Sequence, residues 1–279
     1  MKRIAVCLSA LIIFSAGCSS NRQSGEKESG TIRIKGSDSM LLLVQRLADR
    51  YLTEHPDKNI TVEGGGSGLG VQSLIKGTSD ICAASRPLTP EEVRMIAQRY
   101  QSLGVSILCA KDALSIVIHP SNPVRNLTEQ QIKGIFTGAV TDWSELGGPP
   151  GPITVFRRES NSGTYLYFED HVLLGEEYSS NSISVPGARA MINAVAAESS
   201  AIGYSTSVYA SGVNSVSVNG AEPTMVNVRQ GRYPISRYLY FYTVNPPEGD
   251  VKKFVDWVTG REGQRTVKEN GYVPLYETE

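Results

Sequence analysis

The stretch Arg157-Arg158-Glu159-Ser160-Asn161-Ser162-Gly163-Thr164 is the most informative part of this chain. A run of β-type residues, 152–156, precedes it, and a helical pattern over 164–174 follows it. The Ser-Gly-Thr step is therefore predicted to lie where a loop becomes a helix. The first amides of a helix have no partner within the helix, and the helix dipole is positive at that end.

The residue types in this stretch suit an anion. Gly163 lets the backbone approach a ligand closely, and Ser162 and Thr164 add hydroxyl donors. Arg158 adds a permanent charge on a planar group that matches oxyanions. We therefore predict an anion-binding site shielded from water. The alternative is that Ser162 only caps a helix and both arginines are solvated.

Three further strand-to-helix turns carry glycine, hydroxyl or arginine residues: 36–39 (GSDS), 64–70 (GGGSGLG) and 85–87 (SRP). The glycine run lacks the spacing and the lysine of a P-loop, which argues against ATP binding. In open α/β sheets such turns lie at the carboxyl ends of the strands, where ligands bind. We expect all four turns to face one cleft.

The order of elements predicts the fold class. Strands alternate with helices along the chain, which indicates α/β units and mostly parallel sheets. Residues 120–123 (PSNP) are interpreted as a crossover between two lobes, and an aromatic strand at 238–244 as the return. Lobe 1 is then 31–115 plus 240–279, and lobe 2 is 116–239. Separate strands are expected at 105–109, 114–119, 213–218 and 224–228.

The N-terminus has the pattern of a targeting segment, 1–17, with two basic residues before an apolar run. The apolar run is too short to span a bilayer. The small residues before Cys18 resemble a bacterial lipobox, although Ser15 replaces its usual leucine. Cys18 is thus predicted to carry lipid, with 18–30 as a flexible tether on the extracytoplasmic side of the membrane. The alternative is an ordinary secretory signal with a chance cysteine.

Composition excludes some classes of function. The 279-residue chain is 40% hydrophobic and 20% charged, as in ordinary globular proteins. Its net charge of -1 gives no basic surplus for a nucleic acid. The three histidines, His55, His119 and His171, are scattered, so no metal site is expected. Cys82 and Cys109 lie in apolar runs and either form a disulfide or stay as two buried thiols.

The ordered motifs resemble a known family. GSDSM, GSGLG, DICAASRP and RESNSGT look like the motifs of PstS-type phosphate-binding proteins, the solute receptors of phosphate ABC importers. NPV with IFTG, and YPISR, agree with this resemblance, which extends over about residues 31–275. It implies a periplasmic-binding-protein type II fold, in which two Rossmann-like α/β lobes close on the ligand.

The resemblance also implies a set of ligand residues. Hydroxyls, amides and guanidinium groups would bind phosphate at Ser37, Ser39, Met40, Ser67, Ser85, Arg86, Arg158, Ser162, Gly163 and Thr164. The well-studied branch of the family has an aspartate where this chain has Arg86. We therefore expect Arg86 to join Arg158 in binding the anion, with Asp38 as a candidate substitute acceptor.

The leading hypothesis is a monomeric, lipid-anchored phosphate receptor without cofactor or metal that delivers its ligand to an ABC permease. Arg86 motivates one alternative, a receptor for sulfate, molybdate or another tetrahedral oxyanion. A phosphoester hydrolase is the other alternative. Ser162 has no neighbouring base in the sequence, and its motif is not a nucleophile elbow, so we do not expect an enzyme.

Overall fold

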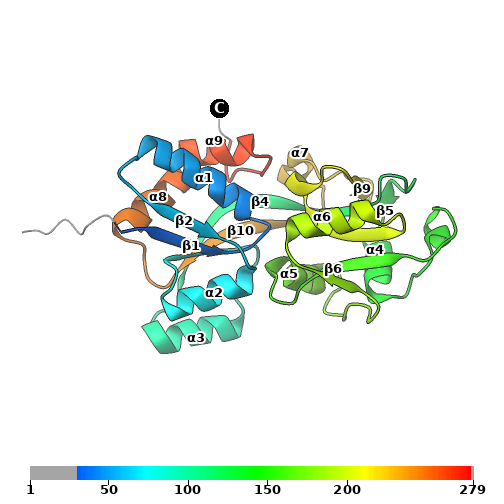
Figure 1. Cartoon of the computed structure of the whole chain (residues 1–279), viewed down its shortest axis with the longest axis horizontal. Helices are drawn as coiled ribbons and strands as arrows, with labels where there is room; N and C mark the ends of the chain where they lie inside the picture. The colour runs from blue at the N-terminus through cyan, green and yellow to red at the C-terminus, as the bar shows by residue number, and fades with distance from the viewer. Residues whose placement is uncertain (1–29, 278–279) are drawn as a thin grey trace, which may run out of the picture.

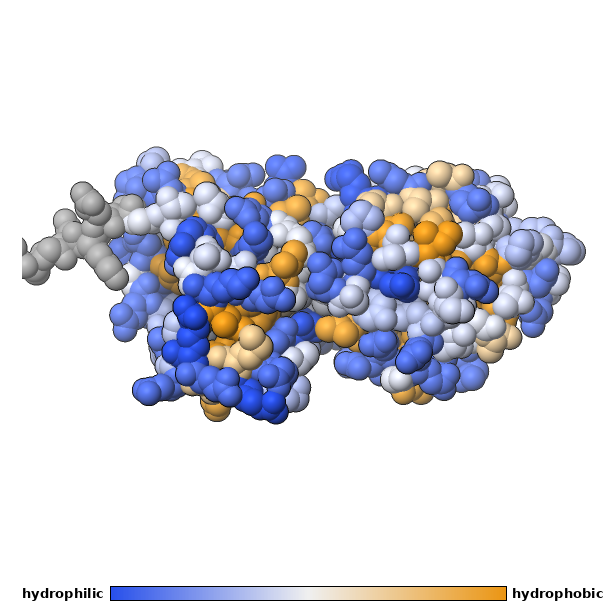
Figure 2. Space-filling view, turned by 60° about the horizontal axis from the view of Figure 1, so that its bottom comes forward, coloured by the Kyte–Doolittle hydropathy of each residue, from blue (hydrophilic) through white to orange (hydrophobic). Residues whose placement is uncertain are grey.

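Two α/β lobes lie side by side, joined by strands β4 (Val105–Ile118) and β10 (Ser236–Thr243) (Figure 1). The computed structural model describes residues 30–277. The predicted targeting segment, Cys18 and the tether up to residue 29 lie outside the described residues. A space-filling view shows the lobes meeting at a waist, with a notch on its lower side (Figure 2).

Lobe 1 contains the sheet β2-β1-β3-β10-β4 between two layers of helices. Helices α1, α8 and α9 cover one face, and α2 and α3 cover the other (Figure 1). Apolar residues at helical spacing make each contact, because one stripe of every helix faces the sheet. The bounds are β1 (Ile32–Gly36), α1 (Leu41–Glu54), β2 (Ile60–Glu63), α2 (Ser67–Lys76), β3 (Ile81–Ala84), α3 (Pro90–Tyr100), α8 (Gly249–Thr259) and α9 (Arg261–Glu269).

Lobe 2 continues the same sheet as β4-β8-β6-β7; β9 also pairs with β4, and β5 pairs with β9. Helices α4 and α5 pack on one face and α6 on the other. Stacked rings such as Phe168 and Tyr204, 4.2 Å apart, fill the first of these cores. The bounds are β5 (Asn126–Leu127), α4 (Glu129–Thr137), β6 (Thr154–Arg158), α5 (Gly163–His171), β7 (Ile183–Val185), α6 (Ala188–Ala197), β8 (Ala201–Thr206), β9 (Asn214–Val218) and α7 (Met225–Arg229), with 3₁₀ turns at Trp143–Leu146 and Ser207–Tyr209.

Strand β4 belongs to both lobes. It pairs with β10 as far as Ala113 and with β8 from Leu114 onward. The expectation of two separate strands here was wrong. Lys111 and Asp112 interrupt the apolar pattern, yet each has a partner on β10: Lys111 lies over the Tyr238 ring and Asp112 pairs with Arg237. Paired polar residues do not break a strand, and a sequence pattern does not show the pairing.

Two other expectations were wrong. The sheet is mixed rather than mostly parallel, because β10 and β4 run antiparallel to their neighbours. Residues 224–228, expected as a strand, lie in the short helix α7 and at its N-cap. The Thr224 hydroxyl caps this helix by accepting the Asn227 amide at 3.2 Å. This cap and the buried Val228 outweigh the β-propensity of the valines.

Both cysteines of the described region, Cys82 and Cys109, are free and buried. Burial raises the pKa of both thiols above its ordinary value. The sequence left open either a disulfide or two buried thiols, and the structure has the two buried thiols. Between residues 30 and 277, no helix has the length and apolar character that crossing a bilayer requires.

Candidate anion-binding site

Serines from three turns of lobe 1 form a connected group of hydroxyls. The Ser39 Oγ lies 2.8 Å from the Ser37 Oγ, which donates to the Ser85 Oγ at 3.1 Å. The Ser85 Oγ is in turn 3.5 Å from the Ser67 Oγ. All four side chains are buried. They come from the turns after β1 and β3 and from the first residue of α2, so these three turns converge as expected.

The start of α5 in lobe 2 lies directly against these serines. A Cβ atom at Gly163 would be 2.3 Å from the Ser67 Oγ and 2.8 Å from the Ser85 Oγ. Only glycine fits such an approach. Ser162 caps the helix, and its Oγ accepts the Thr164 amide at 3.2 Å. Ser162 therefore does cap a helix, as the alternative interpretation held. The cap lies at a buried junction between the lobes and not on a solvated surface.

The glycine run at the start of α2 contacts the loop of lobe 2 that contains Asn161. The Gly68 amide donates to the Asn161 carbonyl at 3.0 Å, and the Asn161 side chain donates to the Gly65 carbonyl at 3.3 Å. A Cβ atom at Gly66, where φ is +94°, would be 2.9 Å from the Asn161 carbonyl oxygen. The absence of side chains thus lets the two lobes meet backbone to backbone.

Arg158 ends β6 and is buried at this junction. Its Nη2 donates to the Asp38 Oδ2 at 2.9 Å, and the Asp38 Oδ1 accepts the Gly65 amide at 2.8 Å. The ion pair therefore links lobe 2 to lobe 1. Burial lowers the pKa of Arg158, and the negative charge of Asp38 opposes that shift. Asp38, a candidate acceptor in the sequence analysis, is thus a direct neighbour of the main cation.

The Nε of Arg158 is buried and has no hydrogen-bond partner among residues 30–277. Buried donors nearly always have a partner, so an unpaired one where the two lobes meet points to a ligand acceptor. The Nε of Arg86 is also buried and unpaired among these residues, but it lies within lobe 1. Guanidinium, hydroxyl and helix-terminal amide donors together suit a small oxyanion. Within the same residues, no three His, Cys, Asp or Glu side chains are arranged to hold a metal ion.

Arg86 has a different setting from the one we expected. Its Nη1 and Nη2 both donate to the Glu92 carboxylate at 2.7 Å, and Nη1 also reaches the Pro87 carbonyl at 2.7 Å. Burial lowers its pKa, but the hydrogen bond and charge of Glu92 outweigh this and raise the pKa overall. Both terminal nitrogens are therefore occupied within lobe 1. Glu92 also completes a capping box with Thr89 at the start of α3.

Met40 contributes to the core of lobe 1. Its side chain is fully buried under α1, and its amide donates to the Ser37 carbonyl at 3.1 Å. This amide, expected as an anion donor, is used to close the turn that presents Ser39.

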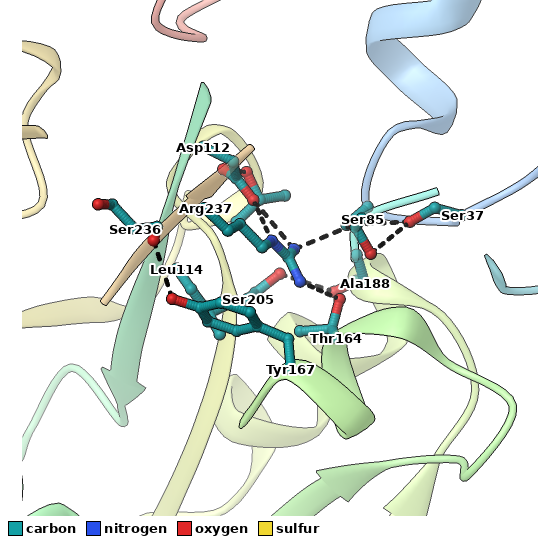
Figure 3. A network of polar contacts seen from close by, with 12 residues as sticks. Ser37, Ser85, Asp112, Leu114, Thr164, Tyr167, Ala188, Ser205, Ser236 and Arg237 are labelled. Atoms are coloured by element: carbon teal, nitrogen blue, oxygen red, sulfur yellow. Dashed lines mark hydrogen bonds and ion pairs between the residues drawn. The ribbon is translucent and has the colours of Figure 1, made fainter. Parts of the chain in front are cut away.

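Arg237 was not predicted as a site residue, and its motif YPISR entered only through the family resemblance. In the structure the buried Arg237 pairs with Asp112 and donates to the Thr164 Oγ1 at 3.1 Å (Figure 3). It also donates to the Ser39 Oγ at 3.2 Å. The available signal was a lone arginine in an aromatic strand, with a lone aspartate in another apolar run.

Comparison with known proteins identifies the family. Residues 21–262 match the PBP superfamily domain. The phosphate-binding protein PstS of Pseudomonas aeruginosa is 30% identical over 276 residues, which cover 91% of this chain and 85% of that protein. The chain belongs to the PstS-type family. Its motifs and its two-lobed α/β fold are those that the resemblance implied.

Two other phosphate-binding proteins are similar to this chain, one in sequence and one in both sequence and structure. The phosphate-binding protein PstS of Bacillus subtilis is 29% identical over 285 residues, covering 98% of this chain and 93% of that protein. A solved structure from Clostridium perfringens, assigned to the phosphate ABC transporter substrate-binding proteins and containing bound phosphate, is 31% identical. It superposes with a TM-score of 0.83 over 88% of this chain and 100% of that one.

Proposed function

We propose that this chain is an extracytoplasmic lipoprotein that binds inorganic phosphate between its lobes and delivers it to an ABC permease. The observation that carries the proposal is the buried Arg158, which pairs with Asp38 of the other lobe and whose Nε lacks a partner among residues 30–277. The PstS relatives, named as phosphate-binding proteins, support the same ligand.

In this proposal Arg158 supplies the charge that phosphate meets. Hydroxyls from lobe 1 and the start of α5 complete the shell: Ser39, Ser67, Ser85, Ser162, Gly163 and Thr164. Ser37 and Met40 support the turn behind Ser39. We place Arg86 outside the shell, because Glu92 occupies its terminal nitrogens. The lobe boundaries at 115/116 and 239/240 stay a prediction.

Calorimetry tests the ligand. The chain from residue 30 onward, unfolded to remove carried-over ligand and refolded, is titrated with phosphate, sulfate and molybdate between pH 5 and 8. We expect binding of phosphate, in preference to sulfate. Absence of heat and of thermal stabilisation with millimolar phosphate would contradict the proposal. Tighter binding of sulfate or molybdate would keep the receptor role and change its ligand.

Anchoring and delivery need separate tests in cells. Cys18→Ser should move the protein from the membrane fraction to the soluble fraction, because the lipid would attach at that sulfur. Deletion of the gene should slow phosphate uptake at low external phosphate if the chain serves a permease. Unchanged fractionation would remove the lipid anchor from the proposal, and unchanged uptake would remove delivery. We also propose a monomer, which size-exclusion chromatography checks.

A further inference from the structure

Arg237 lies where both lobes and the crossing strands meet (Figure 3). It is the second residue of β10 and pairs in register with Asp112 on β4. Both side chains are almost completely buried, with exposed fractions of 2% and 1%. A buried ion pair contributes little to stability compared with apolar residues of the same size, so its retention calls for another reason.

The guanidinium of Arg237 is held on several sides. Its Nη2 and Nε donate to the Asp112 Oδ2 at 3.0 and 3.3 Å. The Thr206 hydroxyl donates to the other oxygen of this carboxylate. The Tyr167 ring covers the guanidinium, with its centroid 5.4 Å from the Arg237 Cζ. The position of the group is thus fixed, and Asp112 balances its charge, so it contributes little net attraction for an anion.

The remaining contacts of Arg237 reach one hydroxyl in each lobe. Its Nη2 donates to the Ser39 Oγ at 3.2 Å, and its Nη1 donates to the Thr164 Oγ1 at 3.1 Å. A guanidinium has donors only, so both hydroxyl oxygens must accept from it. The Thr164 hydroxyl then has its own hydrogen left to donate, whereas the Ser39 hydrogen is shared with the Ser37 Oγ, 2.8 Å away, until an anion accepts it. A bare oxyanion oxygen has acceptors only, so this polarity favours an anion as the next partner of both hydroxyls.

We propose that Arg237 is a positioning residue for anion binding. It orients the hydroxyls of Ser39 and Thr164 as donors and joins them across the lobes, so that both meet the same ligand when the lobes close. The inference rests on the proposed function, since it concerns the same site. It predicts that the contribution of Arg237 to affinity passes through these two hydroxyls and not through its own charge.

The central test is a mutant cycle measured by calorimetry with inorganic phosphate. Arg237→Gln is combined with Asp112→Asn, so that no buried carboxylate is left unpaired. We expect this pair of substitutions to weaken phosphate binding about 10-fold or more, as for a lost network of charge-assisted hydrogen bonds. In a chain that already carries Ser39→Ala and Thr164→Val, the same pair should weaken binding further by less than about 3-fold. Equal losses in both backgrounds, or no loss in either, would overturn the proposal.

The pH dependence separates positioning from direct contact. If Arg237 acts through neutral hydroxyls, the fold-loss caused by Arg237→Gln with Asp112→Asn should be equal at pH 5.5 and pH 8. Phosphate carries one charge at the first pH and mostly two at the second. A loss that grows several-fold at pH 8 would show that the guanidinium contacts the anion itself, and would refute a positioning role.

Two controls keep the outcomes apart. Lys111→Gln, next to Asp112 but directed to the Tyr238 ring, should leave affinity unchanged. Circular dichroism and the thermal midpoint establish that each variant is folded. If the unaltered chain fails to bind phosphate, the proposed function falls, and this inference falls with it. If the unaltered chain binds and the variant binds equally well, only the role of Arg237 is refuted.

Discussion

Arg86 and Arg158 occupy similar places in the two lobes, yet they have different partners. Each lies where a strand ends and a few residues before a helix, and each is buried. Arg86 pairs with Glu92, six residues later in the same lobe. Arg158 pairs with Asp38, 120 residues away in the other lobe. The first pair can persist whether the lobes are open or closed, whereas the second requires them to meet.

This difference indicates which arginine is available to bind an anion between the lobes. Burial is nearly the same for both side chains, at 7% and 3% exposed, so burial alone does not distinguish them. What distinguishes them is the use of the terminal nitrogens, since the Nε of each arginine lacks a partner among residues 30–277. Glu92 occupies both terminal nitrogens of Arg86, whereas Asp38 occupies one of Arg158. An arginine held at both terminal nitrogens stabilises its own turn, while one held at a single nitrogen is available to an incoming anion.

The largest effect is expected for Arg158→Gln. Phosphate affinity should fall about 30-fold or more, because loss of a buried, hydrogen-bonded charge costs roughly 2–5 kcal/mol in binding. Titration calorimetry measures this loss. The matched control is Arg157→Gln, since the neighbouring Arg157 donates to Ser182 within lobe 2 and should not affect affinity. Equal losses at the two positions would refute the special role of Arg158.

A smaller loss is expected for Gly163→Ala. The added methyl group would overlap the Ser67 and Ser85 hydroxyls, so the lobes could not approach as closely. Overpacking of this kind costs roughly 1–3 kcal/mol, which corresponds to about 5- to 150-fold in affinity. The exposed Ser160→Ala is the control. Unchanged phosphate affinity in the glycine variant would show that binding does not need this close contact.

Arg86→Gln should act on stability and hardly on binding. Loss of the bidentate pair should lower the free energy of unfolding by about 2 kcal/mol, less than for a fully buried pair because the Glu92 side chain keeps 16% exposure. Phosphate affinity should change by less than about 3-fold. Urea unfolding measures the free energy of unfolding, and titration calorimetry measures the phosphate affinity. A loss of affinity as large as that of Arg158→Gln would abolish the contrast and return Arg86 to the ligand shell.

The smallest effect is expected at Cys82, which precedes the Arg86 turn on β3. Its thiol is buried and its pKa is raised by that burial, so the reactive thiolate is scarce at pH 8. A thiol reagent should therefore not label the folded chain from residue 30 onward, with or without phosphate. Denaturant should expose both thiols, those of Cys82 and Cys109, so that the reagent labels them. Faster labelling on adding phosphate would mean that this turn moves with the ligand.

Local patterns predicted most of the elements and the turns that meet between the lobes. The helix expected from Thr164 and the strand expected at 213–218 depend on patterns within a few residues, and the structure has them as α5 and β9. The three turns of lobe 1 converge because carboxyl ends of neighbouring strands share one edge of a sheet, and the turn after β6 joins them where the lobes meet. The misread strand at 224–228 shows the limit of this approach, since a side-chain cap and burial outweighed propensity there.

The sequence by itself determined where donors for an anion stand along the chain, because helix starts, glycine turns and arginines are local properties. Only the tertiary structure decided which of these donors are satisfied by the protein. Asp38 and Arg158 are 120 residues apart, and Asp112 and Arg237 are 125 apart. Such pairs form only once two lobes and two crossing strands are packed. No periodicity or spacing in the sequence predicts which residues so far apart along the chain will pair.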